Sequence, residues 1–397
     1  MTNEKPQLWN KNFILLSAMN FLLILVFYLL VIVTVGFAIG ELAASTAQAG
    51  LISGVFVIGT LIGRFLIGKY MSVLGARTSL IMGAVGFFVF TCLYFLPVNV
   101  PMLIGIRFGH GFMMGLCATI LGTIIAQTLP PSRRGEGIGY YSMSSTLATA
   151  FGPFLAIWFM AHYSYTFIFA FTALIAVTCF VVSLLIHVPK LQQPAAKVIA
   201  TSSVKVSKFA QFIEPKAIPI AMIIFIVGTC YSGVLSFINL YSKEIDLVQT
   251  ASFFFLMYAL AILISRPFTG PLMDRKGENI IMYPAIVLMA FGIGLLSQAD
   301  NSWTLLTSAA LLGFGFGNIQ SVCQTIAVKS TTIERMGLAT STFFIALDAA
   351  LGFGPYLLGQ ILDQIGYSQL YLYSAMVTVS CLVWYFLLHG RHVQIKK

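Results

Sequence analysis

The sequence predicts an all-α integral membrane protein with twelve transmembrane helices in two six-helix repeats. Of the 397 residues, 59% are hydrophobic and 9% are charged, whereas a soluble globular domain carries roughly 25% charged residues. Twelve apolar stretches are each long enough to cross a hydrocarbon core of about 30 Å as a helix. A single offset of 202 residues, applied without a gap, aligns the two half-chains with each other.

The first half of the chain supplies six of the expected spans. They are continuously apolar and rich in Leu, Ile, Phe and Ala, whereas the strands of a transmembrane barrel alternate in polarity. The first apolar run lacks the small-residue cleavage motif of a signal peptide, so we expect it to be retained as a helix. The spans are expected at 12–40, 48–70, 79–97, 102–127, 138–161 and 166–187.

The second half supplies six more spans, and a basic segment separates the halves. That segment contains several lysines and small polar residues, which predicts a cytoplasmic linker. The expected domains are a six-helix bundle over residues 1–187, the linker over 188–216, and a second six-helix bundle over 217–397. The spans of the second half are expected at 218–241, 252–272, 280–298, 304–328, 338–362 and 370–389.

Glycines and arginines show the duplication most clearly. Both copies are hydrophobic and run in the same direction, which matches the parallel-repeat plan of transporters, where the substrate site lies between two pseudo-equivalent halves. The offset pairs Gly68 with Gly270, Gly75 with Gly277, Gly111 with Gly313, Gly115 with Gly317, Gly135 with Gly337, Gly152 with Gly354, Arg64 with Arg266, and Arg133 with Arg335.

Basic residues indicate the orientation in the membrane. If the N-terminus is cytoplasmic, every Lys and Arg except Lys243 and Arg107 falls in a segment on the inside, and Arg64 and Arg266 are counted there. This asymmetry predicts that both termini are cytoplasmic. The net charge of +10 then requires no nucleic-acid partner, because the basic residues face the anionic inner leaflet of the bilayer.

The sequence predicts no enzyme, cofactor or metal site. All six cysteines fall within expected spans and form no CxxC pair, which argues against a disulfide framework or a metal cluster. There is no phosphate-binding GxxxxGK[ST] sequence and no nucleophile elbow. We therefore expect transport to be driven by ion or solute gradients.

Two short turns at the expected cytoplasmic side carry a family signature. Turns this tight need glycine where the backbone takes positive φ or packs closely. The first turn reads Gly68-Lys-Tyr-Met-Ser72-Val-Leu-Gly75-Ala-Arg77, and the second reads Gly270-Pro-Leu-Met-Asp274-Arg275-Lys-Gly277. The pattern resembles the loop signature of the major facilitator superfamily, Gly-x-x-x-Asp-Arg-x-Gly-Arg-Lys. With the duplication and twelve spans, the resemblance covers essentially the whole chain.

The resemblance implies that these loops steady the outward-facing state through charge contacts. The first copy has Ser72 at the position where the family has its acid, whereas the second copy keeps Asp274. We therefore expect Asp274 to carry the larger share, together with Arg133 or Arg134. The alternative is that the loop residues only shape a turn and anchor it to lipid headgroups.

The fourth span carries two ionisable residues, Arg107 and His110. The segment resembles the superfamily's Arg-x-x-Gln-Gly signature, with His110 in place of glutamine. An arginine inside a span costs roughly 2.5–3.5 kcal/mol and tends to face a cavity or a partner. The resemblance implies a part in proton transfer, and histidine titrates near neutral pH. Alternatively, Arg107 satisfies backbone carbonyls near the outer surface and His110 replaces a hydrogen-bonding glutamine.

Asp348 is the one carboxylate that we expect deep within a span. It lies about eleven residues into the eleventh span, close to mid-membrane at about 1.5 Å per residue. Burial and neighbouring cations shift a carboxylate's pKa in opposite directions, so an acid at this depth can bind and release a proton. The repeat partner of Asp348 is Thr146. We expect Asp348 to couple protons or contact substrate; the alternative is a structural group that is permanently paired or protonated.

Other residues are expected to bend helices or line a cavity. The segment around Gly152-Pro153 resembles the family's antiporter motif, and Gly354-Pro355 is its repeat counterpart, so we expect kinked, tightly packed helices at both places. The resemblance implies that spans 1, 4, 7 and 10 line a central cavity. Polar candidates for substrate contact in spans 1, 7 and 10, or for ordinary interhelical hydrogen bonds, are Asn20, Tyr28, Tyr231, Asn239, Asn318, Gln320 and Gln324.

The sequence as a whole favours a secondary active transporter of small molecules in a bacterial cytoplasmic membrane. The function expected first is proton-coupled export of partly hydrophobic molecules by a monomer that rocks its two halves about a central site. The alternative is an uptake symporter or uniporter for a sugar, an organic acid or a similar metabolite, with Arg107 binding an anionic group.

Overall fold

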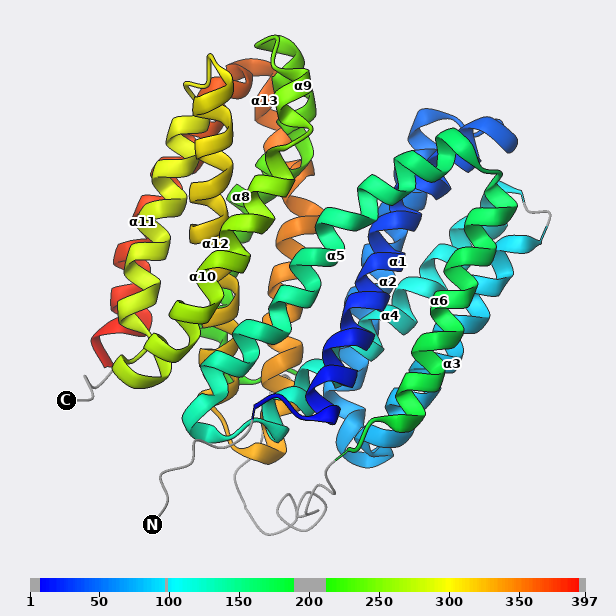
Figure 1. Cartoon of the computed structure of the whole chain (residues 1–397), viewed down its shortest axis with the longest axis horizontal. Coiled ribbons are helices and arrows are strands. Elements are labelled where there is room, and N and C mark those ends of the chain that lie inside the picture. The colour runs from blue at the N-terminus through cyan, green and yellow to red at the C-terminus, as the bar shows by residue number, and fades with distance from the viewer. Residues whose placement is uncertain (1–7, 97–98, 189–211, 393–397) are drawn as a thin grey trace. The chain divides into compact units, whose positions relative to one another are not determined.

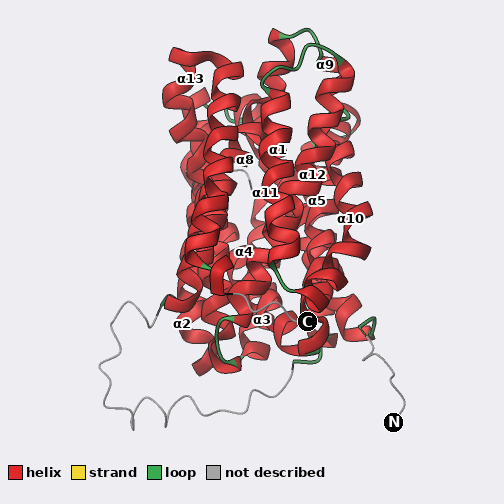
Figure 2. Cartoon of the chain, turned by 90° about the vertical axis from the view of Figure 1, so that its left-hand side faces the viewer, coloured by secondary structure: helices red, strands yellow, loops and turns green. Residues whose placement is uncertain are grey.

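The computed structural model describes residues 8–96, 99–188 and 212–392. These ranges are built from helices and connecting turns, and they contain no strand (Figure 2). Within them, twelve helical segments are long and apolar enough to cross a membrane, which confirms the predicted all-α fold with twelve spans. Most of the expected linker lies outside the described residues. The cytoplasmic location of the termini and the domain boundaries at 187 and 217 stay predictions.

The helices follow the expected order along the chain (Figure 1). Those of the first repeat are α1 (Lys11–Glu41), α2 (Thr46–Leu74), α3 (Ala76–Cys92), α4 (Val100–Thr128), α5 (Arg134–His162) and α6 (Tyr165–Leu185). Those of the second are α8 (Ile218–Glu244), α9 (Val248–Ala251), α10 (Phe254–Lys276), α11 (Asn279–Leu296), α12 (Ser302–Lys329) and α13 (Met336–Leu388). The last helix, with the short 3₁₀ turn before it, covers two spans, Ile333–Leu362 and Gln364–Leu388, and Gly366 close to their junction takes a φ of 76°.

Local sequence sets where these helices begin and end. Asn10, Ser45 and Asn301 each accept a hydrogen bond from the backbone N–H three residues later, which satisfies a donor left free in the first helical turn. In the two signature turns, Gly75 and Gly277 take φ values of 80° and 91°. Because side chains with a Cβ are strained at such angles, both turns require glycine, as the sequence predicts.

The chain forms two compact units whose boundaries cross α5 and α13. The first unit comprises residues 1–130, 147–214 and 332–341, and the second comprises 131–146, 215–331 and 342–397. The beginning of α5 therefore packs with the second repeat, and the beginning of α13 packs with the first. Each unit thus contains contacts between the two repeats.

Small residues allow close helix contact inside each unit. In the first unit, Gly59 and Gly63 of α2 lie directly against the backbone of α4, and Gly111 and Gly115 of α4 lie against the backbone of α2. In the second unit, Gly313 of α12 lies against the backbone of α10. Helices packed this closely are held by van der Waals contact, which replaces the hydrophobic effect as the main association force in a bilayer.

Candidate functional site

The structure brings Arg107 and His110 together around one tyrosine. His110 lies on α4 between Tyr94 and Thr91: its Nδ1 is 3.1 Å from the Tyr94 hydroxyl and its Nε2 is 3.2 Å from the Thr91 hydroxyl. Arg107 lies one helical turn away, and its Nη1 donates to the same Tyr94 hydroxyl at 3.5 Å. Both α4 side chains are 0% exposed. The spacing of three residues places them on one face, as the sequence predicts.

Arg107 makes two further contacts within the first unit. Its Nε donates to the carbonyl of Ile52 at 3.3 Å, and its guanidinium lies 4.4 Å from the ring centroid of Phe56. The bond to a carbonyl agrees with the alternative in which the arginine satisfies the backbone. The Nη2 atom, however, is buried and has no hydrogen-bond partner among the described residues. An unsatisfied donor on a buried cation is costly, so Arg107 retains capacity for another acceptor.

The second repeat contains no copy of this cluster. At the offset of 202, Arg107 aligns with Ala309 and His110 aligns with Leu312, and both counterparts are buried in α12. Tyr94 likewise aligns with Leu296. The cluster is therefore specific to the first repeat and not part of the duplicated packing. Sequence reasoning missed Tyr94 and Thr91 because they lie on the neighbouring helix.

Asp348 lies in the first span of α13 and belongs to the second unit. Its side chain is half-buried. The position agrees with the expected depth inside the span. Its role in proton coupling or substrate contact stays a prediction.

Asp274 binds the beginning of α5. One carboxylate oxygen accepts the N–H of Gly135 at 2.9 Å, and the other accepts the N–H of Glu136 at 2.8 Å. Lys329 lies 3.5 Å from the same carboxylate. The free N–H groups and the dipole of a helix N-terminus both favour an anion, and such a cap contributes about 0.5–2 kcal/mol. Asp274 is thus a helix cap within the second unit.

The expectation that Asp274 works with Arg133 or Arg134 stays a prediction, and the carboxylate of Asp274 attracts both guanidinium groups electrostatically. Arg133 also forms a two-bond ion pair with Glu136, with Nε and Nη2 each 2.8 Å from a carboxylate oxygen. A further cation near Asp274 is Lys329, which also lies 3.3 Å from a carboxylate oxygen of Glu278. Sequence reasoning missed Lys329 because it comes from α12.

The first repeat binds the beginning of α13 through different hydrogen bonds from those that Asp274 makes to α5. Ser341 donates from its hydroxyl to the carbonyl of Arg64 at 2.7 Å, and Gln127 donates to the carbonyl of Ile333 at 3.3 Å. Gly337 lies directly against Met71 of α2, just as Gly135 lies against Met273 of α10. The side chain of Ser72, the counterpart of Asp274, lies outside what the structure describes.

Two buried arginines occupy equivalent positions in the two repeats. Arg64 and Arg266 are only 5% and 3% exposed within α2 and α10, and their expected location toward the cytoplasmic side stays a prediction. Arg64 donates to the hydroxyl of Thr119 at 3.4 Å, and Arg266 donates to Ser321, the repeat counterpart of Thr119. Arg266 also donates to the carbonyl of Gly317 at 2.7 Å. The offset of 202 residues, which pairs the two arginines, was the one sign in the sequence that both have an equivalent structural role.

The polar cavity candidates fall into different environments. Asn318 joins the Arg266 network: its carbonyl oxygen accepts from Thr269 at 2.9 Å and from Arg266 at 3.5 Å. Tyr231 is buried and stacks on Phe316, with ring centroids 4.0 Å apart. The remaining candidates range from buried (Asn20 and Gln324) through half-buried (Tyr28 and Gln320) to exposed (Asn239). Their roles in substrate contact stay predictions.

The two Gly-Pro segments lie inside continuous helices. Pro153 is within α5 and Pro355 is within α13. A Cβ added to Gly152 would lie 2.5 Å from the Cβ of Tyr28 on α1, and one added to Gly354 would collide with Ser232 on α8. Both segments are therefore tightly packed, as expected, whereas the bend expected at each of them stays a prediction.

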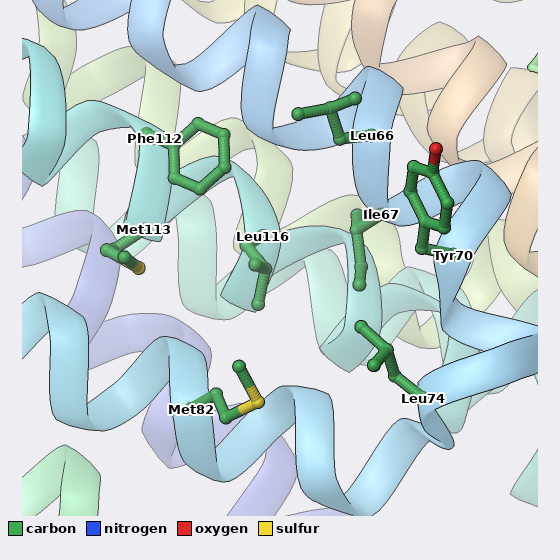
Figure 3. A pocket seen from close by; sticks show the side chains of 8 residues that line it. All are labelled: Leu66, Ile67, Tyr70, Leu74, Met82, Phe112, Met113 and Leu116. Carbon is green, nitrogen blue, oxygen red and sulfur yellow. The ribbon is translucent and has the colours of Figure 1, made fainter.

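A groove in the first unit is separate from all of these residues. It encloses about 250 Å³ between α2, α3 and α4 (Figure 3). Leucine, isoleucine, methionine and aromatic side chains line it, and none is a predicted site residue. The lining residues are Leu66, Ile67, Tyr70, Leu74, Met82, Phe112, Met113 and Leu116.

Comparisons with known proteins agree with this architecture. A profile of the Major Facilitator Superfamily matches residues 15–299 and 248–396. An uncharacterised MFS-type transporter of Methanocaldococcus jannaschii is 23% identical over 341 residues, which cover 85% of this chain and 88% of that protein. The multidrug resistance protein MdtG of Yersinia enterocolitica is 28% identical over 170 residues, only 41% of each chain.

Solved structures show the same fold. The human organic anion transporter MFSD10 (TETRAN) aligns with a TM-score of 0.74 at 14% identity, covering 94% of this chain and 98% of that one. The proton:xylose symporter XylE aligns with a TM-score of 0.74 at 15% identity, covering 97% of each chain. At these identities the likeness concerns the fold alone.

Proposed function

This chain belongs to the Major Facilitator Superfamily, a family of multi-pass membrane transporters, and we propose that it exports small, partly hydrophobic molecules in exchange for protons. Export proceeds by alternating access, in which the two repeats open a central site to one side of the membrane at a time. The partial similarity to multidrug resistance proteins supports export. The protein acts as a monomer in the bacterial cytoplasmic membrane.

The observation that carries proton coupling is the buried cluster around Tyr94. One hydroxyl links the guanidinium of Arg107 to the imidazole of His110, and Thr91 lies at the other ring nitrogen. A chain of hydrogen-bonded hydroxyl and imidazole groups can pass a proton between its members. Its absence from the second repeat supports a specialised role rather than a packing role.

Asp348 is the proposed proton carrier of the second repeat. Its carboxyl group takes a proton from the outside and releases it inward as substrate leaves. Its half-buried position within a span supports this role, because intramembrane carboxylates are costly and mark ion pathways in transporters.

The test compares proton movement in the wild type, Asp348→Asn and a matched control. Everted vesicles loaded with a pH-sensitive dye are challenged with candidate hydrophobic substrates. We expect substrate-evoked proton efflux in the wild type and in Glu244→Gln, which neutralises an exposed acid at the end of α8. Efflux should vanish in Asp348→Asn. Unchanged transport in Asp348→Asn would remove this residue from the mechanism.

The alternative function is uptake of a sugar, an organic acid or a similar metabolite. The unsatisfied Nη2 of Arg107 favours it, since that atom could bind an anionic group. The complete burial of the side chain weighs against it, because a substrate cannot reach the guanidinium through packed neighbours. Accumulation of a labelled organic acid in right-side-out vesicles, lost in Arg107→Gln, would favour uptake over export.

A further inference from the structure

The end of the inter-repeat linker is bound to the first unit. The ring of Phe212 stacks on Phe65 of α2, with centroids 4.5 Å apart and planes within 1° of parallel. Lys69, one helical turn further along α2, places its Nζ 4.2 Å from the centroid of the Phe212 ring. A cation over an aromatic face is attracted by its quadrupole. Phe212 is therefore held by two neighbouring side chains of α2.

Two residues later, the same segment binds the approach to α13. Glu214 is only 3% exposed, and its Oε2 lies 2.5 Å from Nε of Arg335. Arg335 ends the short 3₁₀ turn that leads directly into α13. The linker end thus connects α2 of the first repeat with α13 of the second, and all of these residues belong to the first unit.

The arginine that precedes α5 in the second unit has a different acidic partner from the arginine that precedes α13. There, Arg133 precedes α5 and pairs with Glu136, three residues later. At the corresponding positions of the first unit, Arg335 is retained but Glu136 becomes Leu338, and Asp274 becomes Ser72. The arginine has lost both acids that its counterpart has nearby. The linker supplies the carboxylate instead.

We infer that Glu214 is a positioning residue that holds the beginning of α13 against α2, the role that acidic residues of the second unit have for α5. Phe212 orients the segment so that the buried carboxylate meets Arg335. Breaking this ion pair frees the helix that carries Asp348 to move away from the first repeat. The inference concerns the conformational equilibrium and does not depend on export or on proton coupling.

The test measures how often this contact opens. Met71 is 5% exposed and lies beneath Gly337, so a cysteine in its place reports separation of α13 from α2. The full-length chain, with its six native cysteines replaced by alanine and Met71→Cys added, is placed in nanodiscs and treated with a maleimide. Glu41→Gln, at the exposed end of α1, serves as the matched control.

We expect Glu214→Gln and Arg335→Gln each to raise the labelling rate of the Met71→Cys thiol several-fold, whereas Glu41→Gln leaves it unchanged. The exchanged pair Glu214→Arg with Arg335→Glu should restore protection, which a merely structural loss would not do. If a single variant fails to fold, folding of the exchanged pair still supports the ion pair. Equal labelling in Glu214→Gln and the parent, or an exchanged pair no better than either single variant, would overturn the inference.

Discussion

The beginnings of α5 and α13 pack in the same way but are held by different charged residues. In each, a glycine of the entering helix lies against a methionine, Gly135 on Met273 and Gly337 on Met71. Asp274 caps α5 through two backbone N–H groups. The approach to α13 is held by the ion pair between Glu214 and Arg335. Duplication has kept the packing and changed the source of the acid.

The difference bears on how the two contacts would separate. The acid of the α5 contact comes from the end of α10, inside the same repeat signature that forms the turn. The acid of the α13 contact comes from the segment that joins the repeats. A change in the linker can therefore act on one contact and leave the other in place.

The largest effect is expected from Gly270→Ala. A Cβ at this position would lie 2.7 Å from the Cα of Glu136, so the backbone of α5 must shift. Overpacking of this kind typically costs about 1–3 kcal/mol. We expect the α5 contact to open, measured as faster maleimide labelling of a cysteine at Met273, and transport to fall strongly.

The repeat provides the control for this change. A Cβ at Gly68 would lie 2.8 Å from the hydroxyl oxygen of Ser341, which is a side chain that can be removed. The steric clash caused by Gly68→Ala should therefore be removed by Ser341→Gly. The residue that corresponds to Ser341 in the other repeat is already a glycine, Gly139. If Gly68→Ala and Gly270→Ala open their contacts equally and Ser341→Gly gives no relief, the proposed difference between backbone and side-chain contact is wrong.

A moderate effect is expected from Asp274→Asn. The change removes the negative charge from the α5 N-terminus and leaves one fewer acceptor for its two N–H groups, a loss of about 1 kcal/mol. Transport should decrease more than in Ser72→Ala, and labelling at Met273 should increase only in Asp274→Asn. Equal or reversed effects would contradict the assignment of the stronger loop contact to the second repeat.

Features that depend on a single segment of the chain could be predicted from the sequence, whereas contacts between helices could not. The spans and the glycine turns follow from local properties, because hydropathy and positive φ belong to single segments; Gly75 and Gly277 are examples. The partners of His110 could not be predicted, since Tyr94 and Thr91 come from a different helix. The burial of Arg64 and Arg266 was missed for a related reason: hydropathy treats a charge as surface unless its polar partners are known.

The candidate site was predicted only in part. Arg107 and His110 were found because they interrupt an apolar span at helical spacing. Glu214 was not singled out, since an acid at the end of a polar linker has nothing unusual in its local sequence. The first unit lacks the two acids, because Leu338 and Ser72 stand where the second unit has Glu136 and Asp274. Only the structure shows that Glu214 supplies a carboxylate to Arg335 in their place.

The smallest effect is expected from Lys329→Gln, which gives the second repeat the residue that the first has at this position, Gln127. Lys329 reaches Asp274 and Glu278 at 3.5 and 3.3 Å, but its side chain is 28% exposed. Exposed ion pairs contribute about 0–1 kcal/mol and are screened within about 10 Å at 0.1 M salt.

Labelling at Met273 should therefore rise slightly in low salt in Lys329→Gln and return to the parent rate in high salt. The control Lys276→Gln removes an exposed charge from the turn that carries Asp274 and should show no such dependence. Since the capping N–H groups remain in both variants, a large effect of Lys329→Gln would mean that the lysine, rather than the helix N-terminus, is the main partner of Asp274. The two repeats would then differ in their cations as much as in their acids.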